Sequence, residues 1–363
     1  GPMSLASPLQ SLEIESNPSQ QSRVNVRPPR GSFSESSSSR TTLVGQVPVP
    51  EDRDMGPTPH EQIQQLAAQY AHLGRNPKVY EVFSQLGGKV RFRCGGRCVT
   101  GPPSDFKFNA CAWTSILAPT IFYFWECAPT LWAMNFLHPS LTAALFCLTI
   151  TLMLITSFTD PGIVPRHAMR LLVKDLAEVT AAGIGLDPAR LDITSNECPE
   201  HLLDEIEGAG YRWCQYCRMV QPPRAKHCRD CDCCVLRCDH HCPLVNNCIG
   251  QRNYAYFCGF LVSVCSLGLA VFSGITIWMT AKPDGDDTGS QVRMTLLYML
   301  GIPTALLFLG VFGLTCFHSV LICRGRTTRE ALTGKRYGDG STLFGFRGPP
   351  LFRGQDEVVF PSI

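Results

Sequence analysis

Four long apolar stretches constrain the fold of this chain more than any other feature. They lie at residues 109–133, 141–159, 256–280 and 295–323. Each is near or above the roughly 20 residues that a helix needs to cross a bilayer, and none shows the polar stripe of a helix on a soluble core. Only 17% of the residues are charged, against about 25% in soluble domains. The sequence therefore predicts four transmembrane helices.

The positive charges predict how these helices are oriented. Basic residues precede the first stretch, follow the fourth and fill the segment between the second and third, whereas the two shorter connections have no such excess. We therefore expect both termini and residues 160–253 to face the cytosol. The net charge of +2 argues against a nucleic-acid-binding protein.

Composition divides the rest of the chain around the helices. Residues 1–58 are rich in Ser and Pro and lack the apolar content to fold alone. The expected organisation is an all-α polytopic membrane protein with a cytosolic zinc-bound domain between helices two and three. Its segments are a disordered tail (1–58), a juxtamembrane segment (59–108) with a short helix at 60–73, helices one and two (109–159), a cytosolic loop (160–213), a cysteine-rich zinc domain (214–255), helices three and four (256–323) and a cytosolic tail (324–363).

The loop between helices two and three carries a repeated pattern of metal ligands. Nine of the 19 cysteines lie between residues 214 and 248, and disulfides are not expected in the cytosol. Two sets share the spacing C-x2-C-x9-H-x6-C and are offset by 14 residues. The first is Cys214, Cys217, His227 and Cys234, and the second is Cys228, Cys231, His241 and Cys248. Three thiolates and one imidazole saturate a tetrahedral structural zinc site, so two structural Zn²⁺ ions are predicted.

The repeat leaves Cys233, Cys238 and Cys242 outside both sets, and Cys242 stands where a third set would begin. A second shift of 14 residues takes Cys228 to Cys242, but the positions that would complete a third set hold valine or alanine. Asp239 and His240 stand three and two positions before Cys242 and also lie outside the two sets. A base that raises the thiolate fraction and a carboxylate that orients the base would suit a nucleophilic cysteine.

Local context leaves alternatives open at these positions. His240 could replace the adjacent His241 as a ligand, and only the equal spacing favours His241. Cys233 or Cys238 could likewise replace Cys234 as a ligand. A surplus cysteine in a cysteine-rich segment is also often a small buried residue without a chemical role.

The sequence CDHHCPLVNNCIGQRNYAYF and the preceding cysteine array resemble the cysteine-rich domain of the DHHC family of protein S-acyltransferases. Further matches are the DPG motif at residues 160–162, the TTxE motif at Thr327-Thr328-Arg329-Glu330, Gly250 and Asn253. The resemblance covers roughly residues 80–335. The segment RCGGR before the first stretch is similar to the subgroup that includes the Ras palmitoyltransferases.

The resemblance implies palmitoylation, the transfer of a fatty acyl group from acyl-CoA to cysteines of proteins, by ping-pong kinetics through an acyl-enzyme thioester. It implies that Cys242 is the nucleophile, His240 the general base, Asp239 its orienting partner and His241 a zinc ligand. It also implies that Thr328 lies close to Asp239. The co-substrate would be palmitoyl-CoA, and the protein substrates would carry cysteines near the cytosolic membrane surface.

Further expectations concern location, partners and variant positions. The endoplasmic reticulum, the Golgi and the plasma membrane are the expected membranes, and an accessory subunit is a further candidate partner. Leu244 stands where most family members have Trp. Cys238 and Cys323 are further candidates for acylation. Glu126 and His318 are ionisable residues near the ends of predicted spans, for which snorkelling is the favoured explanation.

Two rival functions were weighed against catalysis. A zinc-finger recognition module on a membrane anchor would need no nucleophile. A scaffold protein without activity would not need the intact DHHC tetrad. The basic residues Arg224, Lys226, Arg229 and Arg237 stand among aspartates, which does not suit a nucleic-acid-binding face, but they could contact coenzyme A phosphates.

Overall fold

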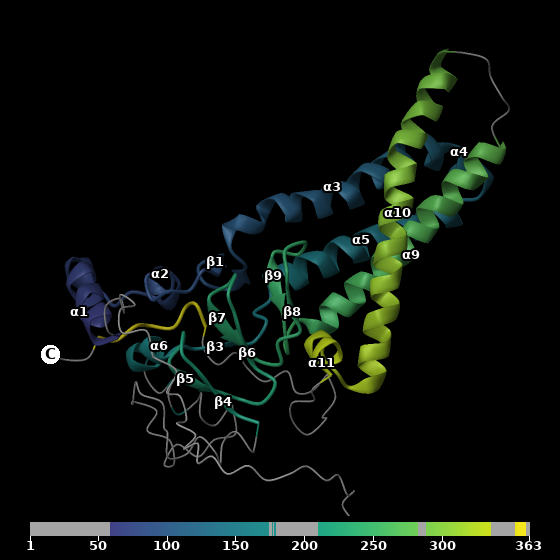
Figure 1. The fold of residues 1–363 in the computed structure, drawn as a ribbon. Coiled ribbons are helices and arrows are strands. Elements are labelled where there is room, and N and C mark those ends of the chain that lie inside the picture. The colour runs from purple at the N-terminus through teal and green to yellow at the C-terminus, as the bar shows by residue number, and fades with distance from the viewer. Residues whose placement is uncertain are drawn as a thin grey trace, which may run out of the picture. The chain divides into compact units, whose positions relative to one another are not determined.

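The structure is a computed structural model that describes residues 59–173, 176, 178, 210–281, 288–334 and 353–360 (Figure 1). All of these residues belong to one compact unit, residues 55–363. The tail predicted to be disordered (1–58), most of the loop before the cysteine-rich segment and the acidic connection at 282–287 lie outside the described residues.

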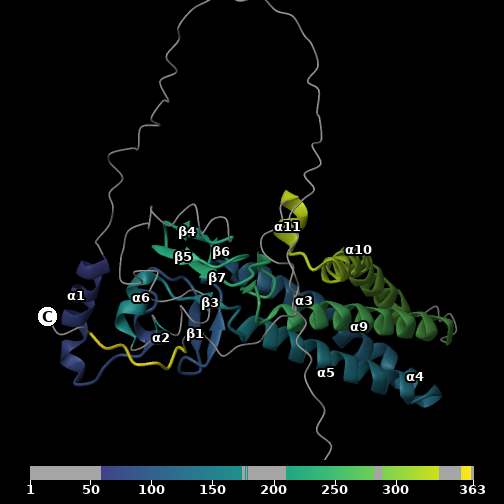
Figure 2. The same cartoon turned by 90° about the horizontal axis from the view of Figure 1, so that it is seen from below.

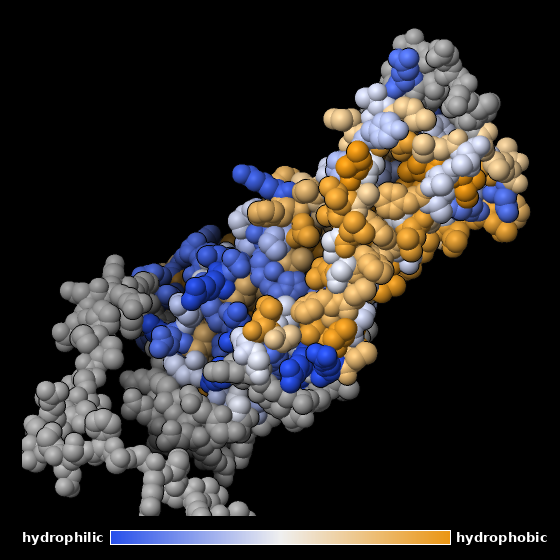
Figure 3. All heavy atoms as spheres, turned by 45° about the vertical axis from the view of Figure 1, so that its right-hand side comes forward, coloured by the Kyte–Doolittle hydropathy of each residue, from blue (hydrophilic) through white to orange (hydrophobic). Residues whose placement is uncertain are grey.

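Long apolar helices form one part of the fold. They are α3 (Phe106–Phe122), the π-helical turn η3 (Tyr123–Cys127), α4 (Ala128–Met134), α5 (Leu137–Phe158), α9 (Tyr254–Ala281) and α10 (Thr288–Arg324). Helix α9 packs against both α5 and α10 (Figure 2). On the face seen in Figure 3, hydrophobic side chains predominate over these helices, whereas hydrophilic ones gather over the short elements. An apolar outer surface of this kind suits contact with lipid.

Among the described residues, three helices are long and apolar enough to cross a membrane: Leu137–Phe158, Tyr254–Ala281 and Leu297–Arg324. They confirm that the second, third and fourth apolar stretches form helices long enough to cross a membrane. The first stretch is also helical, but η3 divides it into two shorter helices. Pro119 lies inside α3 and Pro129 lies in the first turn of α4. Proline removes a backbone donor and clashes with the preceding turn, which favours such an interruption.

The cysteine-rich segment consists of three β-hairpins, so the expected all-α class describes the long helices but not this segment. The hairpins are β4–β5 (Arg212–Cys214, Met219–Gln221), β6–β7 (Lys226–Cys228, Cys233–Val235) and β8–β9 (His240–Cys242, Asn247–Ile249). Strand β3 (Ile163–Val164) joins the middle hairpin in the order β3-β7-β6. Strands of three residues are too short to show a hydrophobic period, which explains why the sequence pattern did not indicate them.

The hairpins repeat with the same 14-residue period as the cysteines. The strand pairs place Cys214 opposite Met219, Cys228 opposite Cys233 and Cys242 opposite Asn247. The turns also recur, because Arg218, Asp232 and Asn246 all adopt positive φ angles of 48°, 48° and 50°. Such angles are uncommon outside glycine. The third hairpin therefore has the backbone of a zinc-binding hairpin, with buried Val245 at the place of its second cysteine.

The remaining short elements pack around the middle and last hairpins. They are α1 (Pro59–Tyr70), η1 (Ala71–Leu73), α2 (Val79–Val82), β1 (Arg91–Arg93), β2 (Cys98–Thr100), η2 (Pro103–Asp105) and α6 (His167–Leu172). The helix predicted at 60–73 is present, and its Ile63 and Leu66 join the core formed with α6 and β7. Val358, near the C-terminus, is buried in the same core.

Two asparagines fasten the last hairpin to the end of α5. The Asn247 side chain donates hydrogen bonds to the carbonyls of Ser157 and Thr159 at 3.1 and 2.9 Å, and Asn253 donates to those of Thr156 and Cys248 at 3.3 and 2.8 Å. The last carbonyls of a helix have no partner within it. These bonds therefore satisfy the end of α5 and fix the hairpin that carries Cys242.

The DPG motif, residues 160–162, follows the end of α5 at the same junction. One oxygen of Asp160 accepts hydrogen bonds from the backbone N–H groups of Gly162 and Ile163, both at 2.8 Å, which closes a tight turn. The other oxygen pairs with Arg252 at 2.8 Å. Gly162 has a φ of 109°, which strongly favours glycine. The turn redirects the chain from α5 into β3, beside the cysteine-rich hairpins.

Candidate functional site

Neighbouring hairpins bring each predicted zinc-ligand set together. In both sets, one ligand atom from each of the four residues lies within 4.8 Å of the others. Each set takes its first two cysteines from one hairpin and its histidine and last cysteine from the next. The backbone N–H groups of Cys217 and Cys231 point at the sulfurs of Cys214 and Cys228, at 3.4 and 3.5 Å. Three sulfurs and one imidazole at this range fit tetrahedral zinc.

A carboxylate supports each of the two histidines in these sets. His227 turns Nδ1 toward its cysteines and Nε2 toward Asp232, at 3.3 Å. His241 turns Nδ1 toward its cysteines and donates from Nε2 to Asp105, at 2.8 Å. Histidines that bind zinc are commonly oriented in this way by a carboxylate on the other nitrogen. Neither aspartate was identified from the sequence, and Asp105 lies 136 residues from its partner.

His240, in contrast, faces away from both cysteine sets. Its Nδ1 donates to Asp239 Oδ2 at 2.7 Å. The Asp239 side chain, which is 1% exposed, also accepts hydrogen bonds from Thr328, from the backbone N at 2.8 Å and from Oγ1 at 2.6 Å. Three donors on one buried carboxylate keep it ionised and fix its direction. The adjacent histidines thus occupy different environments, as the 14-residue spacing requires.

The TTxE motif is a helix N-terminus that faces the hairpins. Thr327 is the N-cap of α11 (Thr328–Thr333), where its side chain accepts from Glu330 N at 3.3 Å and Glu330 Oε2 accepts from Thr327 N at 2.9 Å. Glu330 also pairs with Arg224 at 2.8 Å, and both side chains are buried. Because this pair holds α11 against the hairpins, the first residue of the helix, Thr328, meets Asp239.

Cys242 is buried at the end of β8, and its sulfur is hydrogen-bonded to His240 and to the backbone N–H groups of Leu244 and Val245. Burial raises the pKa of the Cys242 thiol, but the hydrogen bond and charge of His240 outweigh it, and the pKa is lowered. Burial lowers the pKa of His240, but Asp239 and Cys242 outweigh it and raise that pKa to about 9. Both shifts favour a thiolate beside an imidazolium.

An apolar cavity of about 1150 Å³, a volume that includes its open sides, begins at this pair. His240 and Cys242 line it together with side chains from α3, α9 and α10, among them Ile116, Leu261 and Phe308. Leu244, at the position where the resembling family has Trp, also lines the cavity. Cys242 therefore has polar groups on one side and a long apolar space on the other.

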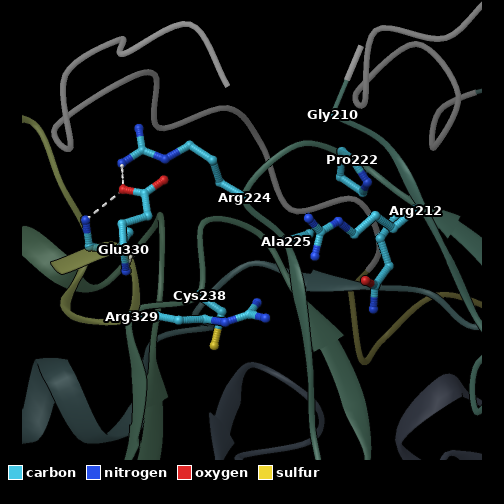
Figure 4. A pocket seen from close by; sticks show the side chains of 10 residues that line it. Gly210, Arg212, Pro222, Arg224, Ala225, Cys238, Arg329 and Glu330 are labelled. Carbon is cyan, nitrogen blue, oxygen red and sulfur yellow. Dashed lines mark hydrogen bonds and ion pairs between the residues drawn. The ribbon is translucent and has the colours of Figure 1, made fainter. Parts of the chain in front are cut away.

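A second, smaller pocket is basic. Cys238 lines this pocket, with Arg212 from β4, Arg224 from the connection between the first and second hairpins and Arg329 from α11 (Figure 4). Figure 4 shows the three guanidinium groups around it and the Arg224–Glu330 pair at its edge. Cys238 in the pocket and His240 in the cavity are two residues apart, so a polar and an apolar binding region adjoin.

The other residues considered from the sequence have different surroundings. Cys233 and Cys238 are buried and belong to neither ligand set. Cys323 is exposed near the end of α10. His318, which was attributed to snorkelling, is instead buried beside Asp239 and His240. The sequence feature that could have indicated a role for His318 is an ionisable side chain within an apolar stretch.

Comparison with known proteins identifies the family. The DHHC palmitoyltransferase family matches residues 208–335. Palmitoyltransferase ZDHHC18 of Mus musculus and of Homo sapiens is 32% identical over 280 residues, which cover 74% of this chain and 70% and 68% of those proteins. Palmitoyltransferase ZDHHC5 of Canis lupus familiaris is 36% identical over 237 residues, 64% of this chain and 30% of that protein. The chain, an integral membrane protein, belongs to the DHHC palmitoyltransferases, a family of protein S-acyltransferases.

Proposed function

We propose that this enzyme transfers a palmitoyl group from palmitoyl-CoA to protein cysteines in two steps, through a thioester on Cys242. The observation that carries the proposal is the position of Cys242 between the Asp239–His240 pair and the apolar cavity. A nucleophile needs a base on one side and its substrate on the other. This arrangement supplies the base and a space shaped for an acyl chain.

In the first step, His240 accepts the proton of Cys242, and the thiolate attacks the carbonyl carbon of the acyl-CoA thioester. The carbon–sulfur bond to coenzyme A breaks, and the leaving thiolate takes the proton from His240. In the second step, His240 accepts the proton of a substrate cysteine, whose thiolate attacks the thioester on Cys242. Cys242 leaves as a thiolate and regains the proton. Each step exchanges one thioester for another, so neither needs a redox partner.

The carboxylate of Asp239 holds His240 in the tautomer whose other nitrogen faces Cys242. It also stabilises the imidazolium that forms when the cysteine ionises. Thr328 orients Asp239 through its two hydrogen bonds. The backbone N–H groups of Leu244 and Val245 add to the stabilisation of the thiolate, as the corresponding groups do for zinc-binding thiolates in the other hairpins.

The two adjoining binding regions suit an amphipathic co-substrate. The apolar cavity would take the acyl chain, and the arginines of the small pocket would contact the phosphates of coenzyme A. Cys242 would then lie near the thioester, where the polar and apolar parts of the molecule meet. Leu244 at the cavity wall leaves more room than a tryptophan there would.

The two cysteine-rich sets would hold two zinc ions. With four protein ligands each, such ions supply structural cross-links between successive hairpins. Cys214, Cys217, His227 and Cys234 would hold one ion, and Cys228, Cys231, His241 and Cys248 the other. The ligands on β8–β9 would fix the hairpin that presents His240 and Cys242.

The positions of the basic residues also support a membrane topology for the chain. We propose that the α3–η3–α4 segment forms a fourth crossing, and that both termini and the cysteine-rich hairpins face the cytosol, as the charge pattern indicates. Acyl-CoA and membrane-proximal cysteines would both reach Cys242 from that side. The endoplasmic reticulum, the Golgi and the plasma membrane fit this orientation, and an accessory subunit is a candidate partner.

The proposal is tested by incubating the purified protein with radiolabelled palmitoyl-CoA and then adding a peptide with one cysteine. The wild-type protein should acquire a label that hydroxylamine removes, and the label should move to the peptide after excess palmitoyl-CoA is washed away. Cys242→Ala should acquire none, whereas the control Cys323→Ala should resemble wild type. Label on Cys242→Ala at the wild-type level would falsify the assignment of Cys242.

A further inference from the structure

The dyad of Asp239 and His240 has a third neighbour that the mechanism above does not use. A ring nitrogen of His318 lies within 4.8 Å of both an Asp239 oxygen and a His240 ring nitrogen. His318 belongs to α10, the helix that leads into Thr328. The α10–α11 region therefore meets the dyad at two points, once through Thr328 and once through His318.

His318 is held by a tyrosine from another helix. Its Nδ1 shares a hydrogen bond of 3.1 Å with the hydroxyl of Tyr254, the first residue of α9. The His318 residue is 2% exposed, and its ring packs against Phe257 and Phe317, with centroids 5.1 and 5.6 Å away. A buried hydroxyl or imidazole nitrogen without a partner is unfavourable. The hydrogen bond therefore fixes the orientation of His318.

The His240 ring lies directly against this assembly. Its centroid is 6.0 Å from that of His318 and 5.4 Å from that of Phe257, which meets it edge-on at 69°. Asp239 holds one nitrogen of His240 and Cys242 is hydrogen-bonded to the imidazole as well, but these in-plane bonds leave the ring free to tilt about the line that joins them. The rings of His318 and Phe257 remove this freedom, because the imidazole cannot tilt without displacing them.

We propose that Tyr254 and His318 are positioning residues of the acyl-transfer site, which act as a hydrogen-bonded pair to hold the His240 imidazole toward Cys242. The inference rests on the proposed function, because it takes His240 as the base. If either member of the pair is replaced by phenylalanine, the polar group of the other member loses this hydrogen bond beside Asp239. That group can then turn toward the carboxylate and compete with His240 for it.

The chain contains a matched control pair. The Tyr123 hydroxyl and His138 Nδ1 share a hydrogen bond of 2.9 Å, and His138 also contacts Ser273 at 3.1 Å. Ser273 and Tyr254 are both on α9, about 28 Å apart along the helix axis. Loss of the Tyr123 hydroxyl therefore removes a partly buried tyrosine–histidine bond far from the dyad.

The test measures the first-turnover rate of Cys242 acylation at varied palmitoyl-CoA concentrations in Tyr254→Phe, His318→Phe, the double variant and the control Tyr123→Phe. Each single variant should be slower by roughly tenfold, with an unchanged half-saturating concentration and two zinc ions per chain. The double variant should be no slower than the slower single variant, because it has neither the Tyr254 hydroxyl nor the His318 imidazole to compete with His240 for Asp239. Tyr123→Phe should acylate at the wild-type rate.

Other outcomes would overturn the inference. Single variants at the wild-type rate would do so, as would a double variant whose defect is the product of the two single defects. A slowing accompanied by zinc loss, or matched by Tyr123→Phe, would show a general packing role instead. A Cys242→Ala sample in the same series distinguishes a failure of the proposed function from a failure of the inference about Tyr254 and His318. Label on it would contradict the proposed function, whereas its absence with normal Tyr254→Phe kinetics would contradict the inference alone.

Discussion

Thr328 and Asp239 are 89 residues apart in the chain, and two hydrogen bonds join them, from the threonine N to Oδ1 at 2.8 Å and from its Oγ1 to Oδ2 at 2.6 Å. The contact links the first residue of α11, the short helix that follows the last membrane helix, to the acid of the DHHC tetrad. It confirms the proximity that the family resemblance implied. It also explains the motif, because Thr327 and Glu330 shape the helix N-terminus that directs the N–H of Thr328 toward the carboxylate.

Replacement of Thr328 should slow acylation without unfolding the protein. Thr328→Val keeps the shape but removes the Oγ1 donor, and a hydrogen bond to a charged group contributes about 1.5–3 kcal/mol. The rate of acyl-enzyme formation should fall by roughly tenfold to a hundredfold. Thr328→Ser keeps the donor and should retain most of the rate. Equal rates for the valine and serine variants would show that the side-chain bond does not orient Asp239.

The two neighbouring histidines should differ in metal content. His241→Ala should lose one of two zinc ions and lower the melting temperature, because it removes a ligand of the second set. His240→Ala should keep both ions and fail to form the acyl-enzyme at the normal rate. Elemental analysis of the purified variants measures the number of zinc ions per chain. Equal zinc loss in both would mean that the 14-residue spacing assigns the pair incorrectly.

The carboxylate behind His241 should contribute to zinc affinity. Asp105→Asn weakens the acceptor for His241 Nε2–H, and loss of such a partner typically costs 10- to 100-fold in metal affinity. Competition with a chelator should therefore remove one ion from this variant at a lower chelator concentration. Glu357→Gln, a change at an exposed carboxylate outside both ligand sets, is the control. A release profile identical to that of wild type would contradict the supporting role of Asp105.

The buried Arg224–Glu330 pair should show strong coupling. Glu330→Leu or Arg224→Met leaves one buried charge without its partner, which costs about 3–5 kcal/mol. The combined variant Arg224→Met/Glu330→Leu removes both charges and should be less destabilised than the sum of the single variants. Thermal unfolding followed by circular dichroism measures this difference. Additive losses would mean that the two side chains act independently.

The orientation in the membrane can be tested with epitope tags. Tags at either terminus should be protected in sealed right-side-out vesicles, because basic residues flank both ends of the membrane region. A tag inserted after Asp287 should be accessible from outside. If the N-terminal tag and the tag after Asp287 were protected together, α3–η3–α4 would not cross the membrane.

The sequence predicted those features that are local or repeated. The 14-residue period separated Cys242 from the ligand cysteines, and the structure shows the same period in its hairpins. The interruption of the first apolar stretch was readable from Pro119 and Pro129 but was outweighed by its overall hydropathy. Asp105 and Tyr254 were not predicted, because their partners are distant in sequence and no local pattern connects them.

The most direct test of the account is to locate the acyl group. Wild-type protein exposed briefly to palmitoyl-CoA, digested at low pH and analysed by peptide mass spectrometry should carry a palmitoyl thioester on Cys242. The modification should disappear when a substrate cysteine peptide is added before digestion. A palmitoyl group on Cys233, Cys238 or Cys323 that forms and turns over while Cys242 remains unmodified would contradict the account.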